Sequence, residues 1–466
     1  MKTKAFDVFC EQRRFDLIFK YLYVDQPFAY VKDAYLESIR AFNDFHELHP
    51  SDGIPKETAQ DFIERFDGLI CSLKEKKYDP AMSYIPKASY GEITDGAHRL
   101  AACAALGLDV EVVETNETDE IYDYLFFFHK GMDPLFMDYG ALEYVKLNPN
   151  AYIVNLHSIT NPNSDEKVER ILEKYGFIYY KKAVKLTYNG YVNLKKLSYG
   201  SFWEESSSWI GNVLNSYAGA QEHAQQSKGK YPLRAYVFVC DSIEKVIRAK
   251  KEIRDLYGKG NYSIHINDTH TEAVWLAETF FNKNSLAFIN NRPFEFEDRL
   301  FDENIEILKK KCEESGVNLE SICAAGSTPL NVFGVRKSHD IDYLSLDDSF
   351  ALVDEVFSSH DSQLSYYPYK KEVIITNPNC FFYYHGIKFI SLDILYKMKR
   401  SRREKPKDYY DCRLIKKILF NQKINKRELL YHLNKSKSHD FLIYFFNIFE
   451  RVLKWLKRIV KRSSNE

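Results

Sequence analysis

The spacing of apolar and polar positions changes along the chain, and each change predicts a different kind of structure. In the first part, Phe62, Phe66 and Ile70 recur at the spacing of one helix face. Short strand and turn patterns follow, and we place a first domain at 1–125. The stretch 119–150 is interpreted as a connection, because it ends in a turn signal before the next strand.

Between 234 and 290 the pattern alternates strand, helix, strand, helix, strand, which predicts a parallel sheet. Both helices begin with a capping-box pattern, at 241–244 and at 269–272. We therefore expect a parallel α/β middle domain over 151–298. One predicted strand end is crowded by His265, Asp268, His270 and Glu272. These residues suit a metal or acid–base site, but they also fit a plain helix start beside a histidine packed in the sheet.

The region 299–432 has α+β character. It opens with a helix, followed by an apolar strand, and includes a hairpin predicted over 372–391. Beyond it, 440–463 forms a basic amphipathic pattern that contains Trp and Phe. Such a helix is typical of a protein that lies on an anionic membrane surface, although packing against the protein itself is the alternative.

Composition excludes several classes of protein. The 466 residues carry 65 Lys and Arg against 66 Asp and Glu, so no overall field favours nucleic acid, and we expect none as a partner. The 8 cysteines form no Cys-x-x-Cys pair, which argues against a zinc knuckle or a disulfide framework. No apolar run is long enough for a signal peptide or a membrane span. We expect a cytoplasmic protein, peripheral on the inner face of the membrane if the basic helix binds there.

The strongest chemical signal lies in 322–346, where one strand leads to Gly326–Ser327 and the next carries Asp340 and Asp342. Alternation along a strand puts both carboxylates on one face, where they would repel unless a divalent cation joined them. Hard oxygen ligands of this kind suit Mg²⁺ or Mn²⁺.

This segment resembles the nucleotidyltransferase fold of the DNA polymerase β superfamily. The resemblance implies that Gly326 and Ser327 bind the phosphates of a nucleoside triphosphate, and that Asp340 and Asp342 are the catalytic metal ligands. It also makes the nearby cations Arg336 and Lys337 candidates for binding phosphate. The resemblance continues through 386–415, including the segment from Lys407 to Asp411. The third carboxylate of that family has no clear equivalent; Glu372 and Asp393 are the candidates.

A second anion site is predicted in 82–113, where a strand and a turn lead into an alanine-rich helix. The helix start combines a glycine, free N–H groups and a guanidinium, which together suit phosphate. The segment resembles the ParB/sulfiredoxin superfamily, in which this element binds nucleotide phosphates. The resemblance assigns Gly96, His98 and Arg99 to phosphate and Asp95 to orienting the arginine or a metal. A helix start capped by Asp95, with His98 and Arg99 in solvent, is the alternative.

The combination resembles multidomain proteins of bacterial capsule or lipopolysaccharide biosynthesis. It implies an Mg²⁺-dependent enzyme that transfers a nucleotidyl or phosphoryl group to a small sugar or polyol precursor. One alternative is a small-molecule kinase acting at Arg99, with nucleotide only bound near Asp340. The other is a non-enzymatic protein that senses nucleotide at the membrane.

Overall fold

The computed structural model divides into two compact units, residues 1–296 with 376–386 and residues 297–375 with 387–466. The predicted domain 1–125 lies in the first unit. The predicted domain 151–298 lies there too, except for residues 297 and 298. The predicted basic helix at 440–463 lies outside the described residues. Those described are 2–47, 55–79, 84–116, 121–199, 208–338, 340–352, 355–402 and 406–420.

The N-terminal part of the first unit packs helices around a small mixed sheet. The strand order is β1-β3-β2, with β1 antiparallel and β2 parallel to β3. The predicted helix face at Phe62, Phe66 and Ile70 is confirmed, since all three side chains are buried on α4. The elements are β1 (Lys2–Lys4), α1 (Ala5–Cys10), α2 (Leu17–Asp25), α3 (Ala29–Asn43), α4 (Ala59–Lys76), β2 (Ile85–Ala88), α5 (Ala97–Ala105) and β3 (Asp109–Thr115).

The stretch 119–150 contains two helices, α6 (Tyr124–His129) and α7 (Pro134–Leu147). Helix α7 packs closely within the unit: the Tyr144 ring stacks on the Tyr179 ring with centroids 3.6 Å apart. Asp138 on the same helix accepts hydrogen bonds from Tyr180 at 2.9 Å and Lys182 at 2.6 Å. These contacts join the N-terminal part of the unit to the next sheet.

That sheet has the order β5-β6-β4-β7, and every neighbouring pair is antiparallel. The prediction of a parallel sheet was wrong, because β4 inserts between β6 and β7, which the pattern after residue 234 cannot reveal. The elements are β4 (Ala151–Leu156), α8 (Asp165–Glu173), β5 (Phe177–Val184), α9 (Tyr188–Tyr199), α10 (Ala218–Ser227), β6 (Leu233–Val239), α11 (Ile243–Tyr257), β7 (Ile264–Ile266) and α12 (His270–Phe280).

The third predicted strand of this region, at 285–291, is helical. It belongs to α13 (Lys283–Asn291), which begins where Asn282 Oδ1 accepts the N–H groups of Asn284 and Ser285. Its buried residues, Ser285, Phe288 and Ile289, follow helical spacing. A short apolar run with a strong cap thus formed a helix where we had predicted a buried strand.

Neither of the two predicted capping boxes is complete in the structure. Helix α11 begins at Ser242 without a capping side-chain bond, and Asp241 instead pairs with Lys245. Helix α12 has half of its box, since Thr269 Oγ1 accepts the Glu272 N–H at 3.2 Å. The Glu272 carboxylate turns instead to His265 and to the Asp268 N–H.

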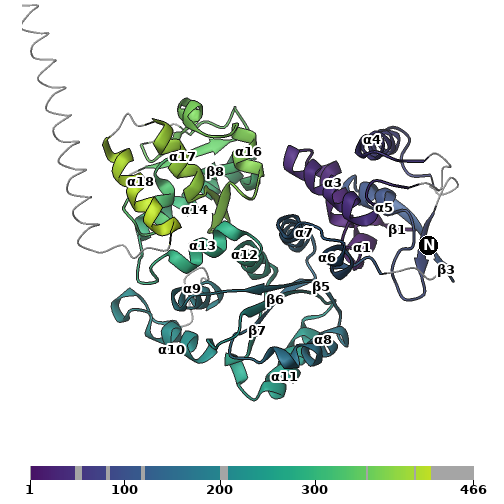
Figure 1. The fold of residues 1–466 in the computed structure, drawn as a ribbon, viewed down its shortest axis with the longest axis horizontal. Helices are drawn as coiled ribbons and strands as arrows, with labels where there is room; N and C mark the ends of the chain where they lie inside the picture. The colour runs from purple at the N-terminus through teal and green to yellow at the C-terminus, as the bar shows by residue number, and fades with distance from the viewer. Residues whose placement is uncertain are drawn as a thin grey trace, which may run out of the picture. The chain divides into compact units, whose positions relative to one another are not determined.

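The two faces of this sheet have different character. One face carries an apolar core with α8 and α11, made of residues such as Val154, Leu172, Phe238 and Ile253. Figure 1 shows α8 and α11 on one side of β5, β6 and β7 and α12 on the other. Successive side chains of a strand point to opposite faces, so the polar residues of β4 and β7 lie on the same side as α12.

The second unit contains a sheet with the strands β10-β9-β8-β12 in that order. Strand β9 is antiparallel to β8 and parallel to β10, and β12 is parallel to β8. The elements are α14 (Arg299–Glu314), β8 (Ile322–Ala324), α15 (Thr328–Val332), β9 (Ile341–Ser345), β10 (Phe357–Ser359), α16 (Lys371–Thr376), β12 (Ile387–Ile390), α17 (Leu392–Arg402) and α18 (Pro406–Leu419).

The predicted hairpin over 372–391 is wrong in its first part, because residues up to Thr376 form α16. Strands occur later, at β11 (Phe381–Tyr384) and β12, on the two sides of His385 and Gly386. The Asn377–Pro378–Asn379 turn signal therefore separates a helix from a strand.

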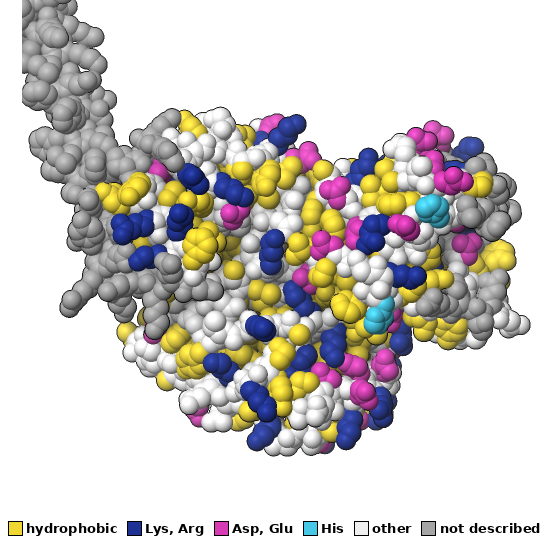
Figure 2. Space-filling view, in the orientation of Figure 1, with side chains coloured by type: hydrophobic (Ala, Val, Ile, Leu, Met, Phe, Trp, Pro, Cys, Tyr) yellow, Lys and Arg dark blue, Asp and Glu magenta, His cyan; other side chains and the backbone are white. Residues whose placement is uncertain are grey.

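On the face that Figure 2 shows, basic and acidic side chains are interspersed. No helix of the described part of the chain has the length and apolarity needed to cross a membrane.

Candidate functional site

The turn at Gly326–Ser327 lies directly against strand β9. Gly326 has a φ of 57°, and a Cβ there would lie 1.7 Å from Asp342 Oδ2, so only glycine fits. The Ala325 N–H donates to the Asp342 carbonyl at 2.7 Å, which ties the turn to the strand. The structure therefore brings together Gly326, Ser327 and Asp342, three of the residues that the sequence singled out.

The predicted carboxylate pair flanks Ile341, which is buried. Asp340 is exposed just before β9, whereas Asp342 on the strand is largely buried, with 18% of its side chain exposed. Burial raises the pKa of Asp342, and the nearby Asp340 raises it further. The Ser358 hydroxyl, which donates to Asp342 Oδ1 at 2.9 Å, opposes this. A divalent cation would relieve the repulsion between the two carboxylates.

Two cations converge on the hydroxyl of Ser327. Arg336 Nη2 donates to Ser327 Oγ at 2.8 Å, and Lys399 Nζ donates to the same oxygen at 3.2 Å. Lys399 comes from α17 and its side chain is fully buried. Together with the turn, these donors next to Asp342 are of the kind that can bind an anion. Sequence analysis identified Arg336 but missed Lys399.

Two buried carboxylates on α18 hold these cations in place. Asp411 accepts Arg336 in bidentate fashion at 2.9 Å and 2.9 Å, and it lies 2.8 Å from Lys399. Asp408 accepts Arg402 at 2.9 Å and 2.7 Å and Lys399 at 3.2 Å. Burial alone would raise the pKa of Asp411, but Lys399 and Arg336 lower it to about 2. The two aspartates after Lys407 therefore position cations.

Three further predicted residues, Lys337, Glu372 and Asp393, are exposed, and the contacts described above involve none of them. Lys337 is 71% exposed and lies 3.6 Å from Asp298. Of the candidates for a third carboxylate, Glu372 is exposed, and Asp393 pairs with Lys397 at 2.7 Å. No group of three or more His, Cys, Asp or Glu residues suited to a metal ion occurs among the described residues.

Two side chains, Tyr367 and His360, also lie between the glycine turn and Asp342. The Gly326 N–H donates to the Tyr367 hydroxyl at 3.4 Å, and that hydroxyl lies 2.7 Å from His360 Nδ1. Since the Tyr367 oxygen accepts from Gly326, its proton is available to Nδ1. His360 Nε2 then carries the ring proton and faces Asp342 Oδ2 at 3.9 Å. Neither His360 nor Tyr367 belongs to a motif, so sequence gave no signal for them.

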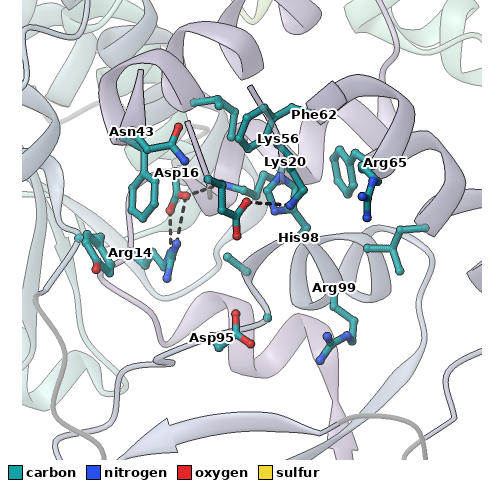
Figure 3. Close-up of a pocket in the computed structure, with 18 of the residues that line it drawn as sticks. Arg14, Asp16, Lys20, Asn43, Lys56, Phe62, Arg65, Asp95, His98 and Arg99 are labelled. Carbon is teal, nitrogen blue, oxygen red and sulfur yellow. Dashed lines mark hydrogen bonds and ion pairs between the residues drawn. The ribbon is translucent and has the colours of Figure 1, made fainter. Parts of the chain in front are cut away.

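The second candidate site is a cavity of about 420 Å³ in the first unit. All four residues predicted at the start of α5 line it: Asp95, Gly96, His98 and Arg99. Sequence analysis missed the other cations that line it, which are Arg14, Lys20, Lys56 and Arg65. Figure 3 shows Arg14, Lys20 and Lys56 around the cavity, with Asp95 and Arg99 at one edge.

The start of α5 differs from a capped helix. Gly96 occupies the N-cap position with a φ of 77°, and the cap has no side-chain hydrogen bond. Asp95 is exposed, and Arg99 Nη1 donates to the Tyr84 carbonyl at 3.1 Å. A Cβ on Gly96 would meet the Ile85 side chain at 3.0 Å, so the close packing also favours glycine.

Asp16 holds two of the cavity's cations. It forms an ion pair with Arg14 at 2.9 Å and another with Lys20, and its side chain is only 1% exposed. Burial raises the pKa of Asp16, but Arg14 and Lys20 outweigh it, so that the pKa falls well below the usual range. Lys56 pairs separately with Glu47 at 2.7 Å. The lining has more cations than carboxylates, which favours an anionic ligand.

His98 contributes no charge to this cavity. Burial and the neighbouring Lys20 hold the pKa of His98 well below its ordinary value, so the ring is neutral. The Tyr35 hydroxyl lies 3.0 Å from His98 Nε2, and the Tyr35 and Phe66 rings meet the imidazole edge to face. The ring can therefore serve a ligand only as a neutral hydrogen-bonding group.

The four residues predicted to crowd a strand end of the middle region separate into different contacts. His265 Nε2 lies 2.6 Å from Glu272 Oε1. His270 Nε2 donates to the Val145 carbonyl at 2.7 Å, and Asp268 lies 3.4 Å from Lys250. These partners agree with the helix-start interpretation and leave His265 packed in the sheet.

Comparison with known proteins finds no matching family, no matching curated protein and no matching solved structure.

Proposed function

We propose that the second unit binds a nucleoside triphosphate with Mg²⁺ or Mn²⁺ and transfers its nucleotidyl or phosphoryl group to a small acceptor. The observation that carries this proposal is the convergence of Arg336 and Lys399 on Ser327, directly beside Asp342. A triphosphate needs cations for its oxygens and carboxylates for its metal, and these two kinds of group adjoin at this turn.

The carboxylates present suit one magnesium ion. Mg²⁺ is commonly held by one or two protein carboxylates together with substrate phosphate oxygens, and Asp340 and Asp342 provide two. When bound, the ion would neutralise charge that develops on the phosphate oxygens. A cluster of three carboxylates for two metals is not formed by the described residues.

The chain's own residues would carry the remaining work of phosphate transfer. Arg336 and Lys399 would hold phosphate oxygens at Ser327 and offset their charge. Asp411 and Asp408 keep both cations in place, so little reorganisation is needed on binding. His360 Nε2 lies 3.9 Å from Asp342 Oδ2 and would help to orient that carboxylate.

The acceptor class rests on the sequence resemblance. It implies a small sugar or polyol precursor of a bacterial capsule or lipopolysaccharide, handled by a cytoplasmic protein that is peripheral on an anionic membrane.

The test is a thermal-shift screen of ATP, CTP, GTP and UTP with and without Mg²⁺. In the wild type we expect a metal-dependent shift that is lost in the Asp340→Asn, Asp342→Asn double variant. The matched control is Asp393→Asn, which removes an exposed carboxylate of the same unit. Because burial raises the pKa of Asp342, the metal-dependent shift should weaken, as the pH falls, at a higher pH than the titration of an ordinary aspartate.

Turnover is tested on the same variants. The double variant should lose nucleotidyl or phosphoryl transfer while keeping the unfolding temperature of the wild type. Full activity in the pure double variant would contradict the proposal.

A second candidate function is favoured by the cavity of the first unit, whose cations outnumber its carboxylates. In this alternative the chain is a kinase of a small hydroxyl compound, and the second unit only binds nucleotide. Loss of phosphoryl transfer in Arg99→Ala, with transfer retained in the Asp340→Asn, Asp342→Asn variant, would favour it. Tight nucleotide binding without any product in either assay would favour the non-enzymatic alternative.

A further inference from the structure

A third cluster of buried polar side chains lies in the first unit, on the face of the antiparallel sheet opposite its apolar core. Neither candidate site uses it. Its central residue is Lys195 on α9, with 1% of the residue exposed. The side chains around it are His157, just after β4, and Tyr199, one helical turn further along α9.

Lys195 has an unusual set of partners for a lysine. Its Nζ lies 2.9 Å from His157 Nε2 and 6.0 Å from the centre of the Tyr199 ring. Among the described residues, no carboxylate forms an ion pair with it. Burial lowers the pKa of Lys195 to about 7. A large fraction of this amine is therefore uncharged at neutral pH, with its lone pair available.

The tautomer of His157 is fixed by its other contact. His157 Nδ1 lies 3.0 Å from the Tyr262 carbonyl, which can only accept, so Nδ1 carries the proton. Nε2 therefore has a lone pair that accepts from Lys195. Burial is the main reason that the pKa of His157 lies well below its ordinary value, and the nearby Lys195 lowers it further. The ring is therefore neutral. His157 is thus placed as a proton acceptor for the amine.

A second and independent observation comes from Asn155 on β4. The residue is 1% exposed, and neither Oδ1 nor Nδ2 has a hydrogen-bond partner. Asn155 pairs across the sheet with His265 on β7, while its neighbours Val154 and Leu156 face the apolar core. Alternation therefore directs Asn155 to the side of His265 and His157. A buried amide without partners is rare in proteins and points to a polar group that is bound there.

The other titratable groups facing this cluster are already engaged. His265 contacts the Tyr199 hydroxyl at 2.7 Å and Glu272 at 2.6 Å. Burial and Lys195 lower the pKa of His223 to about 3, so it is also neutral. Lys195 therefore contacts the neutral His157 imidazole, and His223 beside His157 is neutral as well.

Aromatic rings connect this cluster with the surface. The His157 and His223 ring centroids are 6.3 Å apart, and His223 lies 5.5 Å from Trp209 and 4.9 Å from Tyr262. Trp209 is 44% exposed and Tyr262 is 37% exposed. These ring contacts lead from His157, the partner of Lys195, to two partly exposed side chains.

We propose that Lys195 is the nucleophile of a separate reaction site, where its amine condenses with the carbonyl carbon of a small aldehyde or ketone. An anion is the alternative ligand. An anion site needs a lysine that stays charged, but Lys195 has a neutral imidazole beside it and no carboxylate partner among the described residues. The orphan Asn155 amide suits a carbonyl compound, since Nδ2 can donate to its oxygen and Oδ1 can accept from a hydroxyl.

The reaction would form an imine and release water. The lone pair of Lys195 Nζ attacks the carbonyl carbon, and the carbonyl π electrons move to the oxygen. His157 Nε2 takes the two amine protons one at a time and delivers each to that oxygen. The oxygen leaves as water while the C=N bond forms, so no oxidant or reductant is needed.

The test uses the full-length chain with acetaldehyde as the probe and sodium cyanoborohydride to trap any imine. Mass spectrometry of peptides gives the rate of alkylation at each lysine from pH 6 to pH 9. We expect Lys195 to react at least tenfold faster at pH 7 than Lys337, which is 71% exposed, and to level off above neutral pH. Lys196, the next residue on α9, donates to the Phe294 carbonyl at 2.7 Å and is the matched internal control.

The His157→Gln variant should slow alkylation of Lys195 about tenfold while leaving Lys337 unchanged, and circular dichroism should confirm its fold. If that variant unfolds, the alkylation rates of Lys195, Lys196 and Lys337 in the wild-type chain still test the proposal. Failure to label Lys195, or a rate no greater than that of Lys337 at pH 7, would overturn the proposal. Neither outcome depends on nucleotidyl transfer, because no nucleotide is present.

Discussion

The cavity of the first unit and the turn of the second unit hold their cations in the same way but differ in what lies beside them. In the first, Asp16 holds Arg14 and Lys20. In the second, Asp411 holds Arg336 and Lys399. Of these two sites, the second also has a pair of carboxylates that repel each other, of which Asp342 lies against the turn at Gly326.

This difference separates anion binding from metal binding. A buried carboxylate that fixes two cations prepares a place for phosphate, whatever metal is present. We expect the added carboxylate pair to make binding in the second unit depend on a divalent ion. Removal of metal should therefore weaken anion binding in the second unit and leave it unchanged in the first, and three changes test the comparison.

The largest effect is expected from Asp411→Asn. The substitution leaves Lys399, whose side chain is fully buried, and Arg336 short of a counter-charge, so the second unit should lose about 3–5 kcal/mol of stability. The lowered pKa of Asp411 means that this contribution is present at neutral pH and is lost as the pH falls from about 4 toward 2.

Urea-dependent amide hydrogen exchange in peptides of α17 and α18 measures this loss. The control is Asp393→Asn on α17, whose exposed ion pair should change stability by less than about 1 kcal/mol. Equal effects of the two substitutions would mean that Asp411 does not hold these cations.

An intermediate effect is expected from Arg99→Ala in the first unit. Among the described residues, the guanidinium makes one hydrogen bond, to the Tyr84 carbonyl, so its loss should leave the fold intact. Binding of inorganic pyrophosphate without metal should weaken about tenfold, which corresponds to about 1.4 kcal/mol. Calorimetric titration measures this, with Arg170→Ala, an exposed arginine of α8, as the control. Unchanged affinity would remove Arg99 from the anion site.

The smallest effect is expected from His360→Gln in the second unit. Losing the ring that faces Asp342 should raise the Mg²⁺ concentration needed for a half-maximal nucleotide shift by a few fold, because Asp342 is less well oriented. Tyr367→Phe, which removes the hydroxyl beside His360 Nδ1, should act in the same direction. Pyrophosphate binding in the first unit should not change in either variant. An unchanged magnesium requirement in both would exclude this positioning role.

Local signals in the sequence were enough for several features. Phe62 and Phe66 marked a helix face, and Gly326 and Asp342 marked adjacent strand ends, because each pattern lies within one or two consecutive elements. The middle sheet was different. Its direction depended on β4, a strand distant in sequence, so the pattern after residue 234 suggested a parallel sheet that the pairing contradicts.

The sequence by itself determined the glycine turn, the aspartate pair and the helix start at Gly96, since backbone conformation and residue alternation are local properties. Only the tertiary structure decided which cations accompany them, because Lys399 and Lys20 come from elements far along the chain. It likewise decided which side chains lose their charge: burial keeps His98 neutral and lowers the pKa of Lys195 to about 7. Desolvation depends on everything that packs around a group, and no short pattern of residues records that.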